Sequence, residues 1–341
     1  MEVEYITNRI AGGIQKLVKR IERDVEEMCK RILIPLTEEF GKQDLPAELL
    51  ERLRGYIRDI YWSLKVHLVF HLGIADELQQ QINKVLNKVG AWGGLTDEEM
   101  NELPDQDHVI DPGSKLVEMF GDIMDDRSDR GSTDHANRVM TAAKDHLSKL
   151  SSKNTFKPIV LARVSHTGRS FIGASIAVSH FLRPICLYRR IKNFKQSLGK
   201  ATVYFKPLNI PDRQNWIFEA FHRKKYDSEK KLCQNCKMMF RGNRSENGRL
   251  TFLAACAEYC AVNQLLPDEP NLEQSKDELV VDRLNRNLAR CSYLFENFLH
   301  ISKSCIDAVD SGDENIIKAM YWEVIYKLHI FGLWPECNPY F

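Results

Sequence analysis

The amino-terminal part of the chain is constrained above all by apolar residues that recur at steps of three and four. This spacing places side chains on one face of an α-helix. Five such stripes are found, over residues 6–32, 50–68, 75–89, 114–124 and 135–150. Because proline interrupts helical hydrogen bonding, Pro35 is expected to end the first helix. The sequence therefore predicts an all-helical domain over residues 1–150.

The chain changes character after residue 151. Two short apolar, β-branched runs, over residues 158–164 and 171–178, flank a turn signal at His166–Arg169. This order predicts a strand, a turn, and then a second strand or a helix. Further along, a strand is expected over residues 201–205, and helices are expected over residues 216–221 and 251–266.

Helical spacing returns from residue 271 onward. We therefore expect a mainly α protein of the α+β class with three parts. These are a helical domain (1–150), a small mixed α/β domain that carries cysteines (151–266) and a helical carboxyl-terminal extension (267–341).

Composition excludes several classes of protein. With 43% apolar and 28% charged residues, the chain matches ordinary globular proteins rather than disordered or fibrous ones. It contains no run of 18 apolar residues and no apolar leader, so neither a membrane partner nor secretion is expected. Nine cysteines are an odd number for a disulfide framework. Reduced thiols in the cytoplasm or nucleus are the simpler expectation.

The net charge of +1 conceals a strongly basic centre, because residues 151–250 hold 21 Lys and Arg against 5 Asp and Glu. Within it, basic residues alternate with Tyr188, Phe194 and Tyr204, a mixture able to pair with phosphates and stack on bases. Nucleic acid or a nucleotide is therefore a candidate partner. The residues expected to contact it are Arg183, Arg189, Arg190, Lys192, Lys195 and Lys200. Alternatively, this block docks on the acidic flanks of the same chain.

Four cysteines concentrate within 28 residues, as a Cys233-x2-Cys236 pair followed by a Cys256-x3-Cys260 pair. A Cys-x2-Cys turn directs two thiolates at one ion, and cysteines four apart on a helix share a face. All four together would complete a tetrahedral zinc site. A thiol turn, a hairpin and a ligand-bearing helix in this order resemble a treble-clef zinc finger. Alternatively, these cysteines are unliganded core residues.

The run Cys256–Ala257–Glu258 resembles the zinc-binding helix of the cytidine-deaminase-like superfamily, and residues 160–173 resemble its opening β-hairpin. The resemblance implies that Cys256 is a zinc ligand and that Glu258 is the catalytic proton shuttle. In that family a Cys-x2-Cys pair normally follows the Glu motif, whereas here it precedes the motif.

The number of ligands separates the functional hypotheses. Three cysteine ligands leave a position for water, as catalytic zinc sites do, whereas four close the shell, as structural sites do. Helical spacing of Cys256 and Cys260 favours closure. The leading hypothesis is a zinc-binding, deaminase-like protein that hydrolyses a nucleobase amine. The alternatives are a scaffold with a structural zinc site, which binds nucleic acid or uses its helical domain for protein partners, and a metal-free helical adaptor.

Overall fold

A computed structural model describes residues 19–71, 76–102, 108–124, 129–179, 182–204, 206–223, 226, 229–242, 254–282 and 284–286. The α-helices are α2 (Ile34–Phe40), α3 (Ala47–His71), α4 (Asp76–Trp92), α5 (Asp97–Asn101), α6 (Pro112–Ile123), α7 (Thr133–Ser148), α8 (Arg183–Lys192), α9 (Gln196–Val203), α10 (Gln234–Cys236) and α11 (Ala257–Leu265). Short π- or 3-10 helical segments cover Cys29–Leu33, Arg213–Asn215, Lys237–Arg241 and Leu272–Gln274. The strands are β1 (Val160–His166), β2 (Arg169–Ala174) and β3 (Ile217–His222). The expected mainly α protein with a small sheet is confirmed.

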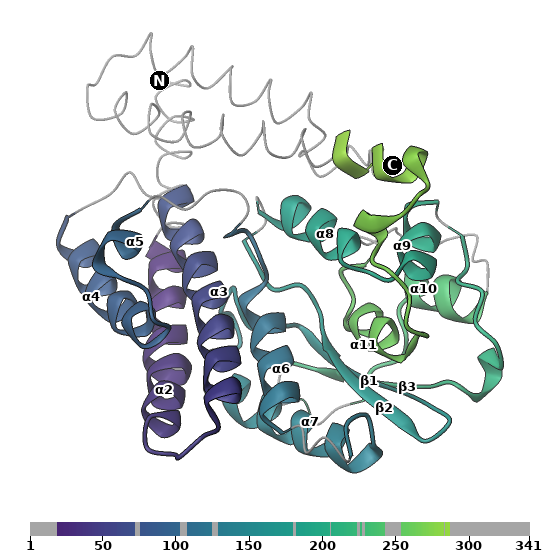
Figure 1. The fold of residues 1–341 in the computed structure, drawn as a ribbon, viewed down its shortest axis with the longest axis horizontal. Coiled ribbons are helices and arrows are strands. Elements are labelled where there is room, and N and C mark those ends of the chain that lie inside the picture. Colours follow the sequence, from purple (N-terminus) through teal and green to yellow (C-terminus); the bar gives the residue numbers. More distant parts are fainter. Residues whose placement is uncertain are drawn as a thin grey trace, which may run out of the picture.

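Amphipathic stripes form the helices of the amino-terminal part, as predicted. The apolar face of α3 is fully buried through Leu53, Ile57 and Leu64. It packs against α4 and α6, so the stripe finds partners on two sides. Figure 1 shows α2 to α5 at one end of the molecule, with α6 and α7 between them and the sheet.

The expectation that Pro35 ends a helix is wrong. Pro35 lies in the first turn of α2, and α2 continues directly from the π-helical segment Cys29–Leu33. A proline is tolerated in the first turn of a helix, where its missing N–H has no intrahelical partner to lose. The wider hydrogen-bond ring of the π-helix lets the chain pass into this turn without a break.

The sheet has the strand order β2-β1-β3, and β1 is antiparallel to both neighbours. A two-residue turn joins β1 and β2, with positive φ at Thr167 (48°) and Gly168 (78°). Two positive φ values match the right-handed twist of a hairpin. The predicted strand–turn–strand arrangement is therefore confirmed.

Helices cover both faces of this sheet (Figure 1). Helices α6 and α7 pack on β2 from one side, where Leu161 and Ile172 join the core of the amino-terminal helices. Helix α11 packs across β1 and β2 on the other side. Gly173 allows this approach, since a Cβ there would lie 2.8 Å from the Ala261 backbone nitrogen. One hydrophobic core thus includes residues from both sides of position 150. The domain boundary expected at residues 150/151 stays a prediction.

Two other expectations are wrong. Residues 201–203 belong to helix α9 rather than to a strand, because the turn that starts at Gln196 buries Leu198 and Ala201 on one helical face. Residues 217–222 form strand β3 rather than a helix, because every residue from Ile217 to His222 pairs with β1. Tertiary pairing overrides local preference in such short runs.

Some predictions concern residues outside the described part of the chain. These are the first part of the helix expected over residues 6–32, which lies in residues 6–18, most of the hairpin expected between the cysteine pairs, in residues 243–253, and the extension beyond residue 286. Within the described residues, no helix has both the length and the apolar character that crossing a bilayer requires.

Candidate metal centre

Three of the four expected cysteines meet at one point. The Sγ atoms of Cys233, Cys236 and Cys256 all lie within 4.8 Å of one another, and those of Cys233 and Cys256 are 3.4 Å apart. Cys236 is fully buried, and the other two are partly buried. Three soft sulfur donors at this separation are a donor set that suits zinc.

Helix termini position these thiols. Cys233 precedes α10 and Cys236 ends it, so the Cys-x2-Cys pair spans a single turn. Cys256 is the N-cap residue of α11 and has extended backbone angles. The partial positive charge at the start of α11 favours a thiolate there. A backbone hydrogen bond from Ile176 to Ala255 (2.9 Å) anchors this start just beyond strand β2.

Two buried aromatic side chains connect the segments that carry the cluster cysteines. Tyr259 on α11 contacts Phe240 with ring centroids 5.0 Å apart, and both side chains are fully buried. Phe240 lies in the π-helical segment that follows α10. The two cysteine-bearing segments are therefore joined through a packed core as well as through their thiols.

Cys260, the fourth expected ligand, does not join the group. Its Sγ lies 4.0 Å from the Ala174 carbonyl oxygen at the end of β2. It lines a second cavity of about 270 Å³ together with Cys186 and Arg190. Burial raises the pKa of the Cys260 thiol. The described residues thus supply three thiols at the cluster, the number that leaves a coordination position open.

Glu258 lies beside the cluster in the first turn of α11 and is only 4% exposed. Burial raises the pKa of its carboxyl group to about 7, and the negative charge of Cys233 adds to this effect. A carboxyl group with a pKa near neutrality can both accept and return a proton. The structure therefore places a buried carboxyl group next to three potential metal ligands.

The thiols influence one another strongly. Hydrogen bonds from Cys236 and Cys256 lower the pKa of Cys233, because they stabilise its thiolate. The same interactions with Cys233 raise the pKa of Cys236. Without a cation, the cluster thus favours one thiolate and retains protons on its neighbours. A bound divalent ion removes that restriction, since metal ligation displaces the remaining protons.

A cavity of about 240 Å³ opens onto Glu258 and two of the cluster cysteines. Its walls come from the sheet, from the loop after β2, from the start of α8 and from the segment before Cys233. It is lined by Ile159, Val160, Ser175, Ile176, Arg183, Ala220, Lys230, Lys231, Cys233, Ala255, Cys256, Ala257 and Glu258. A small molecule in this cavity would contact both the carboxyl group and the metal ligands.

Arg190 of the predicted nucleic-acid surface is instead part of the interior. It forms an ion pair with Asp111 at 3.0 Å, in which the two side chains are 9% and 3% exposed. It also donates hydrogen bonds to the Ser114 hydroxyl (2.6 Å) and the Ala174 carbonyl (3.2 Å). Arg190 thus connects α8 to α6 and to strand β2 and is not available to a phosphate on the surface.

The chain itself engages the lysines of the basic block. Lys192 pairs with Glu273 at 2.8 Å and Lys200 with Asp277 at 3.6 Å. The Lys195 ammonium donates a hydrogen bond to the Leu266 carbonyl at 2.7 Å. The ion pairs of Lys192 and Lys200 agree with the alternative that the basic block docks on acidic segments of the same chain.

The two remaining arginines line cavities. Arg183 lines the cavity beside the cysteine cluster, and Arg189 lines the second cavity with Cys260. Sequence reasoning missed Lys230 and Lys231 as candidate site residues. Their position directly before Leu232–Cys233 was the available signal.

No family model, curated protein or solved structure matches this chain. The geometry of the cysteine cluster and its cavity therefore carries the functional argument.

Proposed function

We propose that the protein is a zinc-dependent hydrolase that removes the exocyclic amino group of a nucleobase. Cys233, Cys236 and Cys256 would hold the ion, and Glu258 would transfer protons. The observation that carries this proposal is the meeting of three thiols and one buried carboxyl group at a single cavity, with Cys260 turned away. The same residue types serve known base deaminases, which use cysteine-held zinc and a glutamate that does not ligate it.

The chemistry requires little beyond these groups. The thiolates of Cys233, Cys236 and Cys256 would hold a zinc ion and leave one coordination position for water, whose acidity the ion would increase. Glu258 takes a proton from the attacking water while the water oxygen bonds to the ring carbon that carries the amine. Glu258 would return this proton to the ring nitrogen, then take the remaining proton from the new hydroxyl group on the ring carbon and deliver it to the amine, which departs as ammonia when the carbon–nitrogen bond breaks. Water and amine are thereby converted to a ring carbonyl and ammonia.

Ammonia release from zinc-loaded protein tests this proposal on cytosine- and adenine-containing bases, nucleosides, nucleotides and single strands. We expect release from one of these classes, and loss of at least about a hundredfold in Glu258→Gln with zinc content unchanged. Glu229→Gln changes an exposed carboxylate near the same cavity and is the matched control. Full activity in Glu258→Gln, or no release from any of these substrates by zinc-loaded protein, contradicts the proposal.

The rival function is a scaffold with a structural zinc site. It is favoured by the position of the cluster, which joins two segments that are 23 residues apart in the chain. In that case Glu258→Gln leaves every function intact, whereas loss of zinc lowers the stability of the protein.

A further inference from the structure

Three cations line the cavity that contains Glu258. Lys230 and Lys231 come from the segment before Cys233, and Arg183 is the first residue of α8. Among the described lining residues, Glu258 is the sole acidic side chain. The cavity thus combines a carboxyl group at its inner wall with a concentration of positive charge.

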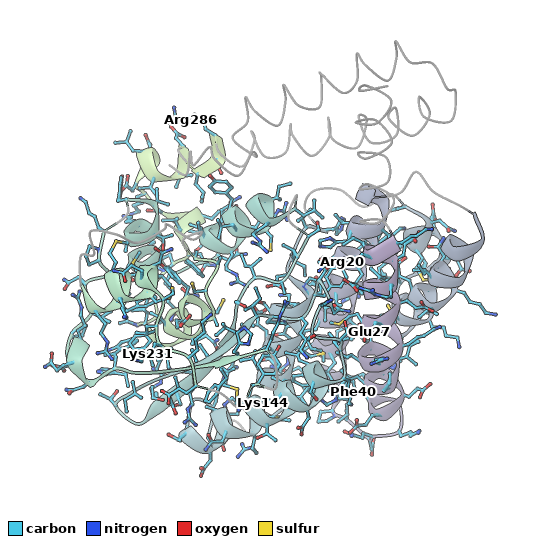
Figure 2. All side chains as sticks on the ribbon, turned by 180° about the vertical axis from the view of Figure 1, so that it is seen from behind. Arg20, Glu27, Phe40, Lys144, Lys231 and Arg286 are labelled. Atoms are coloured by element: carbon cyan, nitrogen blue, oxygen red, sulfur yellow. The ribbon has the colours of Figure 1, made fainter. Side chains whose placement is uncertain are left out.

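The two lysines have no ion-pair partner among the described residues, in contrast to Lys192 and Lys200. Both Lys230 and Lys231 are exposed. A backbone hydrogen bond from Lys230 to the Ala220 carbonyl (2.6 Å) holds this segment beside β3. Figure 2 labels Lys231 on the sheet side of the molecule, far from Phe40 of the amino-terminal helices. Their positive charge is therefore available to a ligand.

Much of the remaining cavity lining is apolar. It includes Ile159, Val160, Ile176, Ala220 and Ala255. An apolar wall suits the face of a flat ring, while ammonium and guanidinium groups suit phosphate oxygens. The cavity volume of about 240 Å³ lies slightly below the range of roughly 300–1,000 Å³ typical of small-molecule sites, so the cavity has room for one small ligand at most.

Three of the six basic residues expected to contact nucleic acid are instead paired with carboxylates of the same chain. Arg190 is paired with Asp111 in the interior, and the ammonium groups of Lys192 and Lys200 are paired with Glu273 and Asp277. A polymer would need a track of unpaired cations along its backbone. The cations around the cavity suit one phosphorylated ligand better than a strand.

We propose, on the basis of the deamination proposed above, that the substrate is a single nucleotide whose phosphate is held by Arg183, Lys230 and Lys231. The base lies against the apolar wall with its amino group toward Glu258. Free bases and nucleosides lack the group that these cations bind, and nucleic acids extend beyond the cavity.

Binding to full-length, zinc-loaded Glu258→Gln protein tests this inference without turnover. The probes are cytidine, adenosine, their 5′-monophosphates and a mixed-sequence single-stranded decanucleotide, measured by titration calorimetry. We expect one monophosphate to bind at least about tenfold more tightly than its nucleoside, because charge-assisted hydrogen bonds are strong. The double variant Lys230→Ala/Lys231→Ala should lose this advantage and leave nucleoside affinity unchanged. Lys149→Ala/Lys153→Ala removes two exposed charges that lie beside Arg31 and Arg20 and outside the cavity lining, and it should change neither affinity.

Equal affinity for nucleoside and monophosphate, a preference that survives in the Lys230/Lys231 variant, or tighter binding of the decanucleotide overturns the inference. The comparison of kcat/KM for nucleoside and monophosphate on wild-type protein gives the same test if Glu258→Gln does not fold. Lysine-dependent nucleotide binding without any ammonia release would refute the deamination and retain the phosphate subsite. Equal deamination of nucleoside and monophosphate would retain the activity and refute the subsite.

Discussion

The sulfur atoms of Cys233 and Cys256 lie 3.4 Å apart although 23 residues separate them in the chain. Cys256 reaches this position because it caps α11, and α11 is held against the sheet at Gly173. The cluster therefore depends on the packing of one helix on one hairpin. Changes to the thiols and changes to that packing should have the same outcome, which is loss of the metal.

Serine replacements at the cluster should remove zinc, whereas replacement of Cys260 should not. We expect Cys233→Ser and Cys256→Ser to lose stoichiometric zinc and to melt several degrees lower, since about 1 kcal/mol corresponds to 2–4 °C in a large domain. Cys260→Ser should retain one zinc per chain, because its sulfur lies against Ala174 instead. Metal content by mass spectrometry and thermal melting measure both effects. Zinc loss from Cys260→Ser alone would show that the ligand set is not the one described here.

His146 should make the protein less stable in mild acid. Its ring packs on Phe120 with centroids 4.8 Å apart, and burial lowers the pKa of the imidazole below its usual value of 6.5. The folded protein thus binds fewer protons here than the unfolded chain does. The stabilising contribution is present above pH 6.5 and is lost as the pH falls from there toward the lowered folded pKa.

The variant His146→Gln should accordingly lose less free energy of unfolding between pH 7.5 and pH 5.5 than wild type does. Urea denaturation at the two pH values measures the difference. An identical loss in both proteins would mean that the imidazole titrates alike in the folded and unfolded states.

The predictable parts of the fold are those that local physics determines. Helices α3, α4, α6 and α7 follow from their stripes, and the turn at Thr167–Gly168 follows from two short apolar runs around a glycine. Strand β3 could not be predicted in this way. Residues 217–222 become a strand only because β1 offers an edge for pairing, and β1 lies more than 50 residues earlier in the chain.

The candidate site likewise has a part that the sequence predicts and a part that depends on tertiary packing. The three cysteines of the cluster could be named from spacing and Glu258 from the resemblance to the deaminase-like superfamily, whereas the exclusion of Cys260 could not be predicted. The rule that residues four apart share a face requires both to be helical. Cys256 is an N-cap residue with ψ of 152°, so its side chain departs from the helical rotation that Cys260 follows. Which lysines line the cavity likewise depends on the tertiary packing of the segment before Cys233.

The buried pair of Arg190 and Asp111 should contribute far more to stability than the exposed pairs of the basic block. Asp111 also accepts hydrogen bonds from the Gly113 and Ser114 backbone at the start of α6. Arg190→Ala leaves this carboxylate buried without its cation and should cost about 3–5 kcal/mol of unfolding free energy. Lys192→Ala, which breaks the pair with exposed Glu273, should cost no more than about 1 kcal/mol. Urea denaturation compares the two variants. Similar small losses in both would contradict a structural role for Arg190.

Gly173 should couple the sheet to the metal centre. A Cβ at this position would overlap the Ala257 carbonyl oxygen and lie 2.9 Å from the Cys260 Cβ, so Gly173→Ala must push α11 away from β2. Because Cys256 caps α11 and Glu258 lies in its first turn, their displacement should lower zinc affinity and reduce stability by about 1–3 kcal/mol.

Gly121→Ala is the matched control, since a Cβ there meets nothing within 4 Å on helix α6. It should stabilise the protein by about 0.5–1 kcal/mol, as alanine does for glycine inside a helix, and leave zinc affinity unchanged. Competition with a chromophoric chelator gives the affinities, and urea denaturation gives the stabilities. If Gly173→Ala binds zinc as tightly as wild type, the position of the cluster does not depend on the contact between α11 and the hairpin.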